Sequence, residues 1–409
     1  MGRRIIALSV LVLACCGAAS AASTKPASWA TPQIKAVTAA GLMGATTVQA
    51  FRADDPLTAQ SLEDIVYAIK LRTATEPEGG DPGTPPTTTT VPTTTTTTTT
   101  TSTNPWSTTT TTTVPVTTTT VPVPTTTTVP TTTTTPAPLP APKQVANPDR
   151  PVPMWELDAR LVGALGLNTA ASAFTKGAKA AGLSVPTRFG TEVVARLLGL
   201  RLNHPAADDA LELRPQDTAT RAEAAYSVAQ ILSFSDWQVE SVMQAAAAFT
   251  LPSLSDWQKR ILTAAASHIG MPYIWGGTSD KTETEFGVTS KGGYDCSGFV
   301  WRVYKETWYP GEGTLATTLR GRTTYEMSGE VPASKRIGFD KLQPADVIFF
   351  GDKGPKSQPS QVGHMGIYLG NGWFIHSSEY GVAVTTLTGW YRQEFAWARR
   401  PLAEAGLAS

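Results

Sequence analysis

The sequence predicts an α+β protein with a helical N-terminal half and a C-terminal domain of mixed helix and strand. Apolar residues recur at helical spacing over residues 28–69 and again over 174–232. Residues 362–378 instead read as two alternating strands around a Gly-Asn-Gly connection. Between the helical segments lies a tract of threonine and proline, which divides the chain.

The threonine and proline tract runs from about Pro86 to Pro142. It has almost no apolar surface to bury, so burial cannot offset the entropy lost on ordering. We therefore expect a disordered linker over residues 78–148. The whole chain has 33 basic and 33 acidic side chains, so it has no net charge to attract nucleic acid.

The N-terminus has the pattern of a secretory signal over residues 1–21. Arg3 and Arg4 precede an apolar run, and Ala19 to Ala21 form a small-residue cleavage site. The run is shorter than the roughly 20 residues of a spanning helix, and no later stretch comes close, so we expect no transmembrane segment in the mature chain. A lipid on Cys15 is an alternative, but Leu13 fits that pattern poorly.

The helical segments on the two sides of the linker resemble one another. Residues 28–44 and 51–69 predict a short helix, a turn and a second helix, with Thr58 as the N-cap of the second. A helix, an "AAGL" stop and a second helix start recur from Phe174. Aligning the stretch from Leu213 with the one from Phe51 pairs Arg214 with Arg52, Asp217 with Asp55 and Thr220 with Thr58. Each unit is too small to bury a core alone, so the units should pack together.

The Trp29-Ala30 start, the "AAGL" helix end and "TRAE" at Thr220 to Glu223 resemble S-layer homology modules. The resemblance covers residues 24–70 and 150–235. It implies that these modules bind a secondary polymer of the bacterial cell wall. The first copy has "TAQS" in place of "TRAE", which puts its binding in doubt, and plain helical spacers are the alternative interpretation.

The C-terminal domain begins with a capped helix. Ser255 is placed as the N-cap and Gln258 as the capping-box partner, with Gly270 as the stop. After removal of residues 1–21, Cys296 is the single cysteine of the chain and has no disulfide partner. It is therefore either a buried structural residue or a reactive thiol.

The position of Cys296 favours the reactive thiol. Gly292 and Gly293 break the chain, Asp295 can cap, and the stretch from Cys296 places Phe299 and Val303 on one helical face. Cys296 then lies in the first turn, where free N–H groups and the helix dipole should stabilise a thiolate.

A thiolate nucleophile needs a base and a group that orients the base. His364 and His376 lie on the two predicted strands. If Gly370 to Gly372 form a three-residue loop, His376 lies opposite Gly366 and is a same-face diagonal neighbour of His364.

The other two histidines, His204 and His268, read as ordinary surface or boundary residues. A zinc site built from Cys296, His364 and His376 is an alternative, but the usual closely spaced cysteine pairs are absent. No phosphate loop or dinucleotide fingerprint occurs, so no cofactor or metal is expected.

Four motifs of residues 256–402 resemble those of the NlpC-type cell-wall peptidases, which are bacterial papain-like enzymes. In chain order they are "IGMPYIWGGTS", "YDCSGFVWRVY", "LQPADVIFF" and "GHMGIYLGNGWFIHSS". The resemblance implies a small antiparallel sheet packed with helices. It also implies Cys296 as nucleophile, His364 as base, His376 as the orienting residue and Tyr273 as a hydroxyl near the oxyanion.

The resemblance also implies a substrate, the peptide stems of peptidoglycan, usually cut between γ-D-glutamate and a diamino acid. The chain departs from the family by a long insertion between Ser279 and Tyr294, which could alter stem selection. The sequence thus predicts a secreted, cell-wall-associated cysteine endopeptidase of peptidoglycan with wall-binding modules and a long tether. An amidase or acyltransferase with the same triad, and a non-catalytic wall-binding protein, are the alternatives.

Overall fold

The computed structural model describes residues 28–44, 47–75, 141–201 and 212–407. The predicted signal segment, most of the predicted linker and His204 lie outside these residues. Among the described residues, no helix is both long enough and apolar enough to cross a bilayer.

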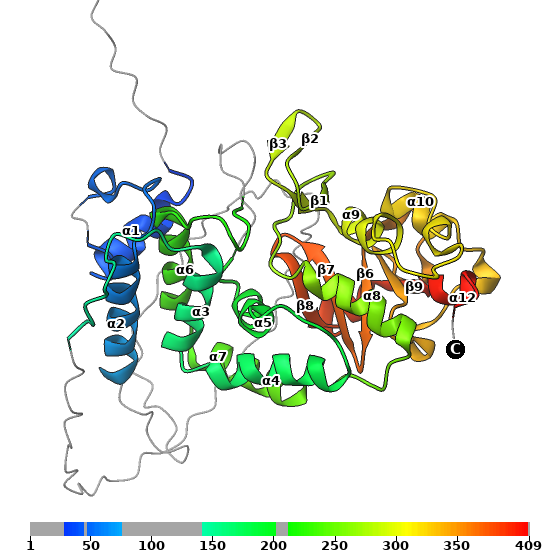
Figure 1. Cartoon of the computed structure of the whole chain (residues 1–409), viewed down its shortest axis with the longest axis horizontal. Helices are drawn as coiled ribbons and strands as arrows, with labels where there is room; N and C mark the ends of the chain where they lie inside the picture. The colour runs from blue at the N-terminus through cyan, green and yellow to red at the C-terminus, as the bar shows by residue number, and fades with distance from the viewer. Residues whose placement is uncertain (1–27, 45–46, 76–140, 202–211, 408–409) are drawn as a thin grey trace, which may run out of the picture. The chain divides into compact units, whose positions relative to one another are not determined.

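Twelve α-helices occur in the described ranges (Figure 1). They are α1 (Thr31–Ala39), α2 (Ala59–Thr75), α3 (Met154–Ala164), α4 (Asn168–Ala180), α5 (Phe189–Leu197), α6 (Arg221–Leu232), α7 (Asp236–Ala248), α8 (Asp256–Ser267), α9 (Cys296–Trp301), α10 (Thr324–Gly329), α11 (Gly389–Glu394) and α12 (Pro401–Glu404). A π-helical turn, Arg302–Glu306, continues α9. Short 3₁₀ turns cover Gln49–Phe51, Leu315–Thr317, Ala333–Lys335, Phe339–Lys341, Gly354–Lys356 and Pro359–Gln361.

The main sheet has five strands in the order β8-β7-β6-β5-β9, all antiparallel. Its strands are β5 (Val347–Gly351), β6 (Val362–Gly370), β7 (Trp373–Ser378), β8 (Gly381–Thr386) and β9 (Phe395–Arg399). Two smaller pairs join β1 (Thr278–Ser279) to β4 (Gly293–Tyr294) and β2 (Glu283–Glu285) to β3 (Val288–Ser290). The expected small antiparallel sheet packed with helices is confirmed.

The predicted repeats pack around a three-way junction. Leu57 N–H donates to the Ala219 carbonyl, Ala219 N–H to that of Val152, and Val152 N–H to that of Leu57, at 2.8 to 2.9 Å. Each of these residues lies just before a helix, α2, α3 or α6. The closed cycle gives the three helix starts an approximate threefold arrangement.

The alignment of Arg52 with Arg214 and of Asp55 with Asp217 is confirmed by their contacts. Each arginine forms an ion pair with the aspartate three residues later, at 2.5 Å in the first copy and 2.9 Å in the second. The third copy, around Val152, was missed. In this copy Pro153 occupies the N-cap position in place of the threonine that marks the other two.

The linker does not separate the helical modules from the C-terminal domain, as the predicted tether would require. Among the described residues, those up to Lys70 and those from Pro142 on belong to one compact unit. The end of the predicted linker also packs on α2. The side-chain amide of Gln60 donates a hydrogen bond to the Lys143 carbonyl at 3.3 Å and accepts one from the Val145 N–H at 3.1 Å. The C-terminal boundary predicted for the linker, residue 148, therefore lies too far along the chain. The described segments before and after the linker belong to the same compact unit.

The helical region and the sheet share one hydrophobic core. Phe174 of α4 and Phe249 after α7 both meet the ring of Trp373 on β7 edge to face, with centroids 5.7 and 5.0 Å away. This core anchors the strand that carries His376.

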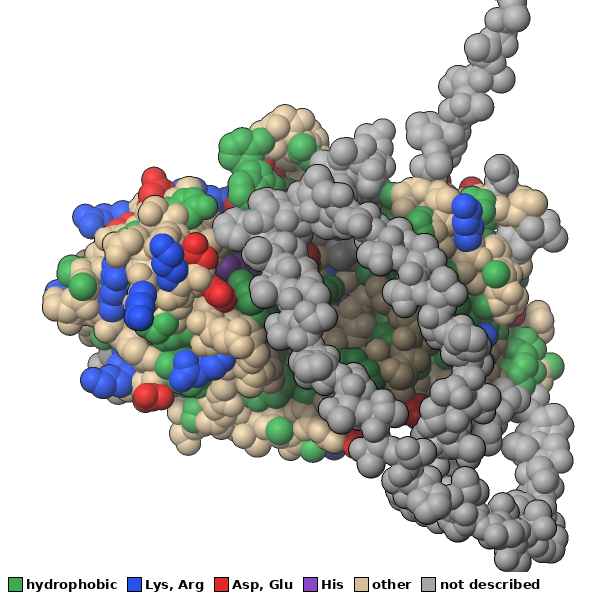
Figure 2. Space-filling model, turned by 180° about the vertical axis from the view of Figure 1, so that it is seen from behind, with side chains coloured by type: hydrophobic (Ala, Val, Ile, Leu, Met, Phe, Trp, Pro, Cys, Tyr) green, Lys and Arg blue, Asp and Glu red, His purple; other side chains and the backbone are tan. Residues whose placement is uncertain are grey.

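The insertion between Ser279 and Tyr294 folds into the β2–β3 hairpin. The hairpin projects beside β1 (Figure 1), and its surface carries hydrophobic side chains in the view of Figure 2. Glu283 fixes its base by accepting hydrogen bonds from the Thr278 and Ser279 N–H groups at 2.9 and 3.3 Å.

Candidate active site

Cys296 is the first residue of α9, as the sequence predicts. Asp295 is the N-cap, and its carboxylate accepts hydrogen bonds from the Gly298 N–H and from the Ser297 hydroxyl, the latter at 3.0 Å. Phe299 and Val303 are fully buried on the face expected for them. The cap sets the residue at which the helix begins, and therefore sets the position of the Cys296 thiol.

Arg322 also binds the Asp295 cap. Its guanidinium donates to both oxygens of Asp295, at 3.2 and 3.3 Å, to the Ser297 hydroxyl at 2.8 Å and to the Gly276 carbonyl at 2.7 Å. The Gly276 N–H in turn donates to Asp295 at 3.0 Å. One arginine therefore ties the "WGGTS" segment to the start of α9.

His364 on β6 and His376 on β7 are hydrogen-bonded, with Nε2 of His364 2.7 Å from Nδ1 of His376. Ile367 pairs with Ile375 in the antiparallel ladder. The next pair in the same register is Gly366 and His376, so His376 lies opposite Gly366 as predicted. The predicted loop length was wrong, because Gly370 pairs with Trp373 across a register shift and leaves only Asn371 and Gly372 as the connection.

This hydrogen bond leaves Nδ1 as the nitrogen of His364 that is available to a thiol. For Nδ1 to accept a proton, Nε2 must carry the hydrogen and donate to His376. His376 then carries its own hydrogen on Nε2. The second imidazole thus selects the tautomer that makes His364 a base.

Aromatic rings surround the two imidazoles. Phe350 stacks on His364 at 5.6 Å between centroids, Phe374 lies 4.7 Å from His376, and Tyr391 lies 5.3 Å from His376. Burial in this environment disfavours the imidazolium, and so lowers the pKa of His364 to about 4. The pKa of His376 falls well below its usual value because of burial and the nearby His364. Both rings are neutral at pH 7.

Cys296 lies beside β6. Its Sγ is 3.5 Å from the Thr324 hydroxyl at the start of α10, and the Ser297 and Met365 N–H groups also bond it. Met365 follows His364 in β6, so the thiol lies against the strand that carries His364.

Burial in the free protein opposes the predicted stabilisation of a thiolate. Burial, followed by the negative charge of Asp295, raises the pKa of the Cys296 thiol to about 11, against the smaller opposing effect of the three hydrogen-bond donors. The resting pair is therefore a neutral thiol and a neutral imidazole.

Tyr273 lies within electrostatic reach of the thiol. Burial raises the pKa of its hydroxyl, and the charge of a Cys296 thiolate raises it further. The phenol therefore remains protonated and can donate a hydrogen bond near Cys296. Its role stays a prediction.

Arg322 and Thr324 were not identified from the sequence. Arg322 lies just before α10 and Thr324 is its first residue, in a stretch with no periodic pattern, and their contacts with residues 295–297 give them a place in the site. The Thr323 capping box with Glu326 is the one local signal that could have fixed the start of α10.

His268, expected to be an ordinary surface or boundary residue, lies at the end of α8 and is largely buried. It is the C-cap of α8, and its Nδ1 lies 3.1 Å from the Tyr294 hydroxyl. No three His, Cys, Asp or Glu side chains in the described ranges are grouped as metal ligands would be.

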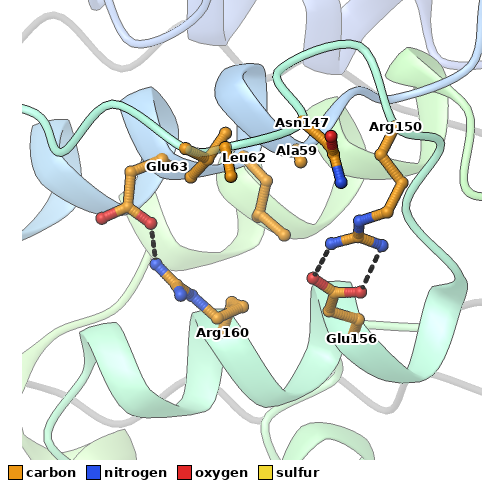
Figure 3. Close-up of a pocket in the computed structure, with 9 residues that line it drawn as sticks. Ala59, Leu62, Glu63, Asn147, Arg150, Glu156 and Arg160 are labelled. Atoms are coloured by element: carbon orange, nitrogen blue, oxygen red, sulfur yellow. Dashed lines mark hydrogen bonds and ion pairs between the residues drawn. The ribbon is translucent and has the colours of Figure 1, made fainter.

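A hollow away from these residues lies between α2 and α3 (Figure 3). Its volume is about 270 Å³. Two ion pairs cross its lining, Arg150 with Glu156 and Arg160 with Glu63 (Figure 3). Asn147 and Leu62 also line it. The hollow is thus polar and nearly balanced in charge.

Residues 270–400 match the model of the NlpC/P60 family. The probable peptidoglycan endopeptidase LytE of Bacillus subtilis is 34% identical over 140 residues, which are 34% of this chain and 32% of LytE. A gamma-D-glutamyl-L-lysine dipeptidyl-peptidase of Bacillus cereus is 37% identical over 141 residues, 33% of each chain. A crystal structure of an NlpC/P60 family protein from Bacillus cereus aligns at 26% identity over 38% of this chain and 43% of that one, with a TM-score of 0.27.

The C-terminal part of the chain is therefore an NlpC/P60 domain, as its motifs predicted. Both relatives are peptidases by name, and LytE is named as a probable peptidoglycan endopeptidase; the chain spans about a third of their length. The family match begins at residue 270, so the resemblance of the helical region to S-layer homology modules stays a prediction.

Proposed function

We propose that the chain is a secreted peptidoglycan endopeptidase that hydrolyses amide bonds in cell-wall peptide stems. The observation that carries the proposal is the 2.7 Å hydrogen bond between His364 and His376, on strands that pack against the helix beginning at Cys296. A nucleophile, a base and a group that orients the base are the minimum for acyl transfer through a thiol.

In the proposed reaction, Nδ1 of His364 takes the thiol proton as Cys296 Sγ attacks the amide carbonyl. Since both groups are neutral at rest, the charge separates only as the carbon–sulfur bond forms. The Cys296 N–H and the Tyr273 hydroxyl donate to the oxyanion. His364 returns the proton to the leaving amine, and a water molecule activated by His364 then releases the acyl group.

The proposed bond joins D-glutamate, through its γ-carboxyl, to a diamino acid. The name of the Bacillus cereus relative describes a peptidase for such a bond, which supports the assignment. Because the match covers only part of each relative, the bond must be found by experiment.

Mass spectrometry of fragments released from purified peptidoglycan distinguishes the candidate functions. The proposal predicts new ends at γ-glutamate and at the amine of the diamino acid. Cleavage between the stem and the sugar would indicate an amidase, and a transferred acyl group an acyltransferase. Binding without any product would indicate a non-catalytic wall protein.

The helical region is proposed to hold the protein on the wall by binding a secondary polymer. The hollow between α2 and α3 supports this, because it offers amide, guanidinium and carboxylate groups to a hydroxyl-rich chain. Deletion cannot test it, since the helices share the core of the catalytic domain.

A substitution that fills the hollow gives a cleaner test. On a Cys296→Ala background, Ala146→Trp should reduce co-sedimentation with purified walls, because Ala146 lies exposed in the lining. Ala403→Trp, on the exposed side of α12, is the matched control. Equal sedimentation of the two variants would exclude the hollow as the wall-binding site.

A further inference from the structure

The tip of the β2–β3 hairpin has an unusual sequence for its conformation. Phe286 and Gly287 have φ values of 52° and 82°, so both central residues of the turn are left-handed. Such turns favour Asn-Gly or Asp-Gly, and a bulky residue there is strained. The Phe286 side chain is also 77% exposed. Neither feature stabilises the fold, and strain retained at one position is a reason to look for function there.

Phe286 lies close to the nucleophile's helix. A methyl group on Gly276 would lie 2.6 Å from the Phe286 ring, so the ring covers that glycine. Gly276 donates to Asp295, the cap of the helix that starts at Cys296. Trp275, the residue before Gly276, is 71% exposed. Trp275 and Phe286, referred to below as the aromatic pair, are therefore two exposed aromatic residues that adjoin Gly276, one along the chain and one through its ring.

The hairpin is held from both sides. Glu283 fixes it to β1, and the Lys291 carbonyl accepts a hydrogen bond at 2.9 Å from Arg214 of the helical region. The Lys291 ammonium lies 3.8 Å from Asp217 in the same region. A hairpin fixed at its base in this way holds Phe286 in one position before a ligand arrives, which lowers the cost of binding.

We propose that the aromatic pair of Trp275 and Phe286 binds a sugar ring of the glycan strand to which the peptide stem is attached. This inference rests on the proposed peptidoglycan substrate. The stem offers small methyl groups, charged ends and flexible chains. The sugars offer rings with a flat face of C–H groups, and such faces match aromatic rings in shape and polarity. The insertion thus selects stems that are still joined to glycan.

The test compares two substrates that contain the same stem, one linked to a disaccharide and one free. Phe286→Asn removes the ring and suits the left-handed turn, so the hairpin should keep its shape. We expect kcat/KM for the glycan-linked stem to fall about tenfold, with the free stem unchanged. Trp275→Ala should act in the same direction.

Trp308→Ala is the matched control. Trp308 is 74% exposed, but the adjacent Tyr309 packs near Trp257 of α8, away from Gly276. The control should leave the ratio of the two substrates unchanged. An equal loss on both substrates with Phe286→Asn, or no loss on either, would overturn the inference.

Failure of the proposed function would be seen separately. If the wild type cleaves neither substrate, the peptidase assignment fails. The sugar site is then tested by the binding of an N-acetylglucosamine oligosaccharide to the wild type and to Phe286→Asn. Weaker binding to the variant would support the site, and equal binding would overturn it.

Discussion

The thiol and the imidazole at the centre of the candidate site are both neutral at rest. Burial raises the pKa of Cys296 to about 11 and lowers that of His364 to about 4. A thiolate–imidazolium pair would require the pKa of Cys296 to be lower than the pKa of His364. In the proposed mechanism, His364 therefore takes the proton during attack, when the substrate has displaced water and the oxyanion shares the charge.

The first prediction concerns the alkylation of Cys296. In a Cys15→Ser, Cys16→Ser chain, Cys296 is the only thiol. Because its pKa is raised, the thiolate fraction at pH 7 should be of the order of 10⁻⁴. The rate of reaction with iodoacetamide should rise about tenfold per pH unit from pH 7 to 9. A plateau near neutral pH would mean a preformed thiolate and would contradict the neutral pair.

A second prediction concerns His376, whose Nδ1 accepts the hydrogen bond from His364. His376→Ala removes the acceptor, so kcat should fall about 10²-fold to 10⁴-fold. His376→Asn places an amide oxygen near the same point and should recover part of the loss. Steady-state kinetics on a stem peptide would measure both, and wild-type rates in the alanine variant would remove His376 from the mechanism.

Helix α9 depends on close approach of its first turn to the "WGGTS" segment. A methyl group on Gly298 would lie 1.9 Å from the Gly277 carbonyl oxygen, which is backbone and cannot move aside easily. The thiol is positioned by this contact together with the Asp295 cap and Arg322.

A third prediction follows for Gly298→Ala. The added methyl group should lower the free energy of unfolding by about 1–3 kcal/mol, and should reduce activity further by shifting Cys296. Gly338→Ala is the control, because nothing lies within 4 Å of that position and its φ is −79°. Urea unfolding measures both. Equal stability of the two variants would show that the contact is not tight.

The elements that the sequence predicted are those with local signals. The caps at Ser255 and Asp295 follow from residue type, and the pairing of the two histidine strands follows from their alternation. Arg322 reaches Asp295 across 27 residues, and nothing local marks such a contact. The third helical repeat was hidden by a proline at its cap, and the thiol's pKa depends on burial that a sequence does not display.

At the scale of the whole molecule, the helical region is part of the catalytic unit. Arg196 of α5 is buried and donates to the Gly270 carbonyl at 2.7 Å and to that of Tyr380. Gly270 lies three residues before Tyr273, and Tyr380 lies in the turn after β7, the strand that carries His376. Glu212 pairs with this arginine at 2.9 Å, and Glu192 lies 3.7 Å from it. One side chain thus connects the helices to two segments of the site.

The fourth prediction is that Arg196→Ala destabilises the entire unit. It removes the nearer of two arginine partners from the buried carboxylates of Glu212 and Glu192, which then keep only Arg201 and Arg188, so the free energy of unfolding should fall by about 3–5 kcal/mol. Arg52→Ala removes an exposed arginine and should change stability by no more than about 0.5 kcal/mol. Denaturation followed by fluorescence should show one transition for both variants. A sheet transition unaffected by Arg196→Ala would show that the helices and the domain fold independently.

The most direct test of the account is hydrolysis of purified peptidoglycan by the full chain and by its Cys296→Ala variant. The variant removes only the Sγ atom from a helix whose cap and packing remain. We expect the wild type to release stem fragments and the variant to release none above background, with unchanged unfolding and wall sedimentation. Release of the same fragments by the variant at a rate near that of the wild type would contradict a mechanism centred on this thiol.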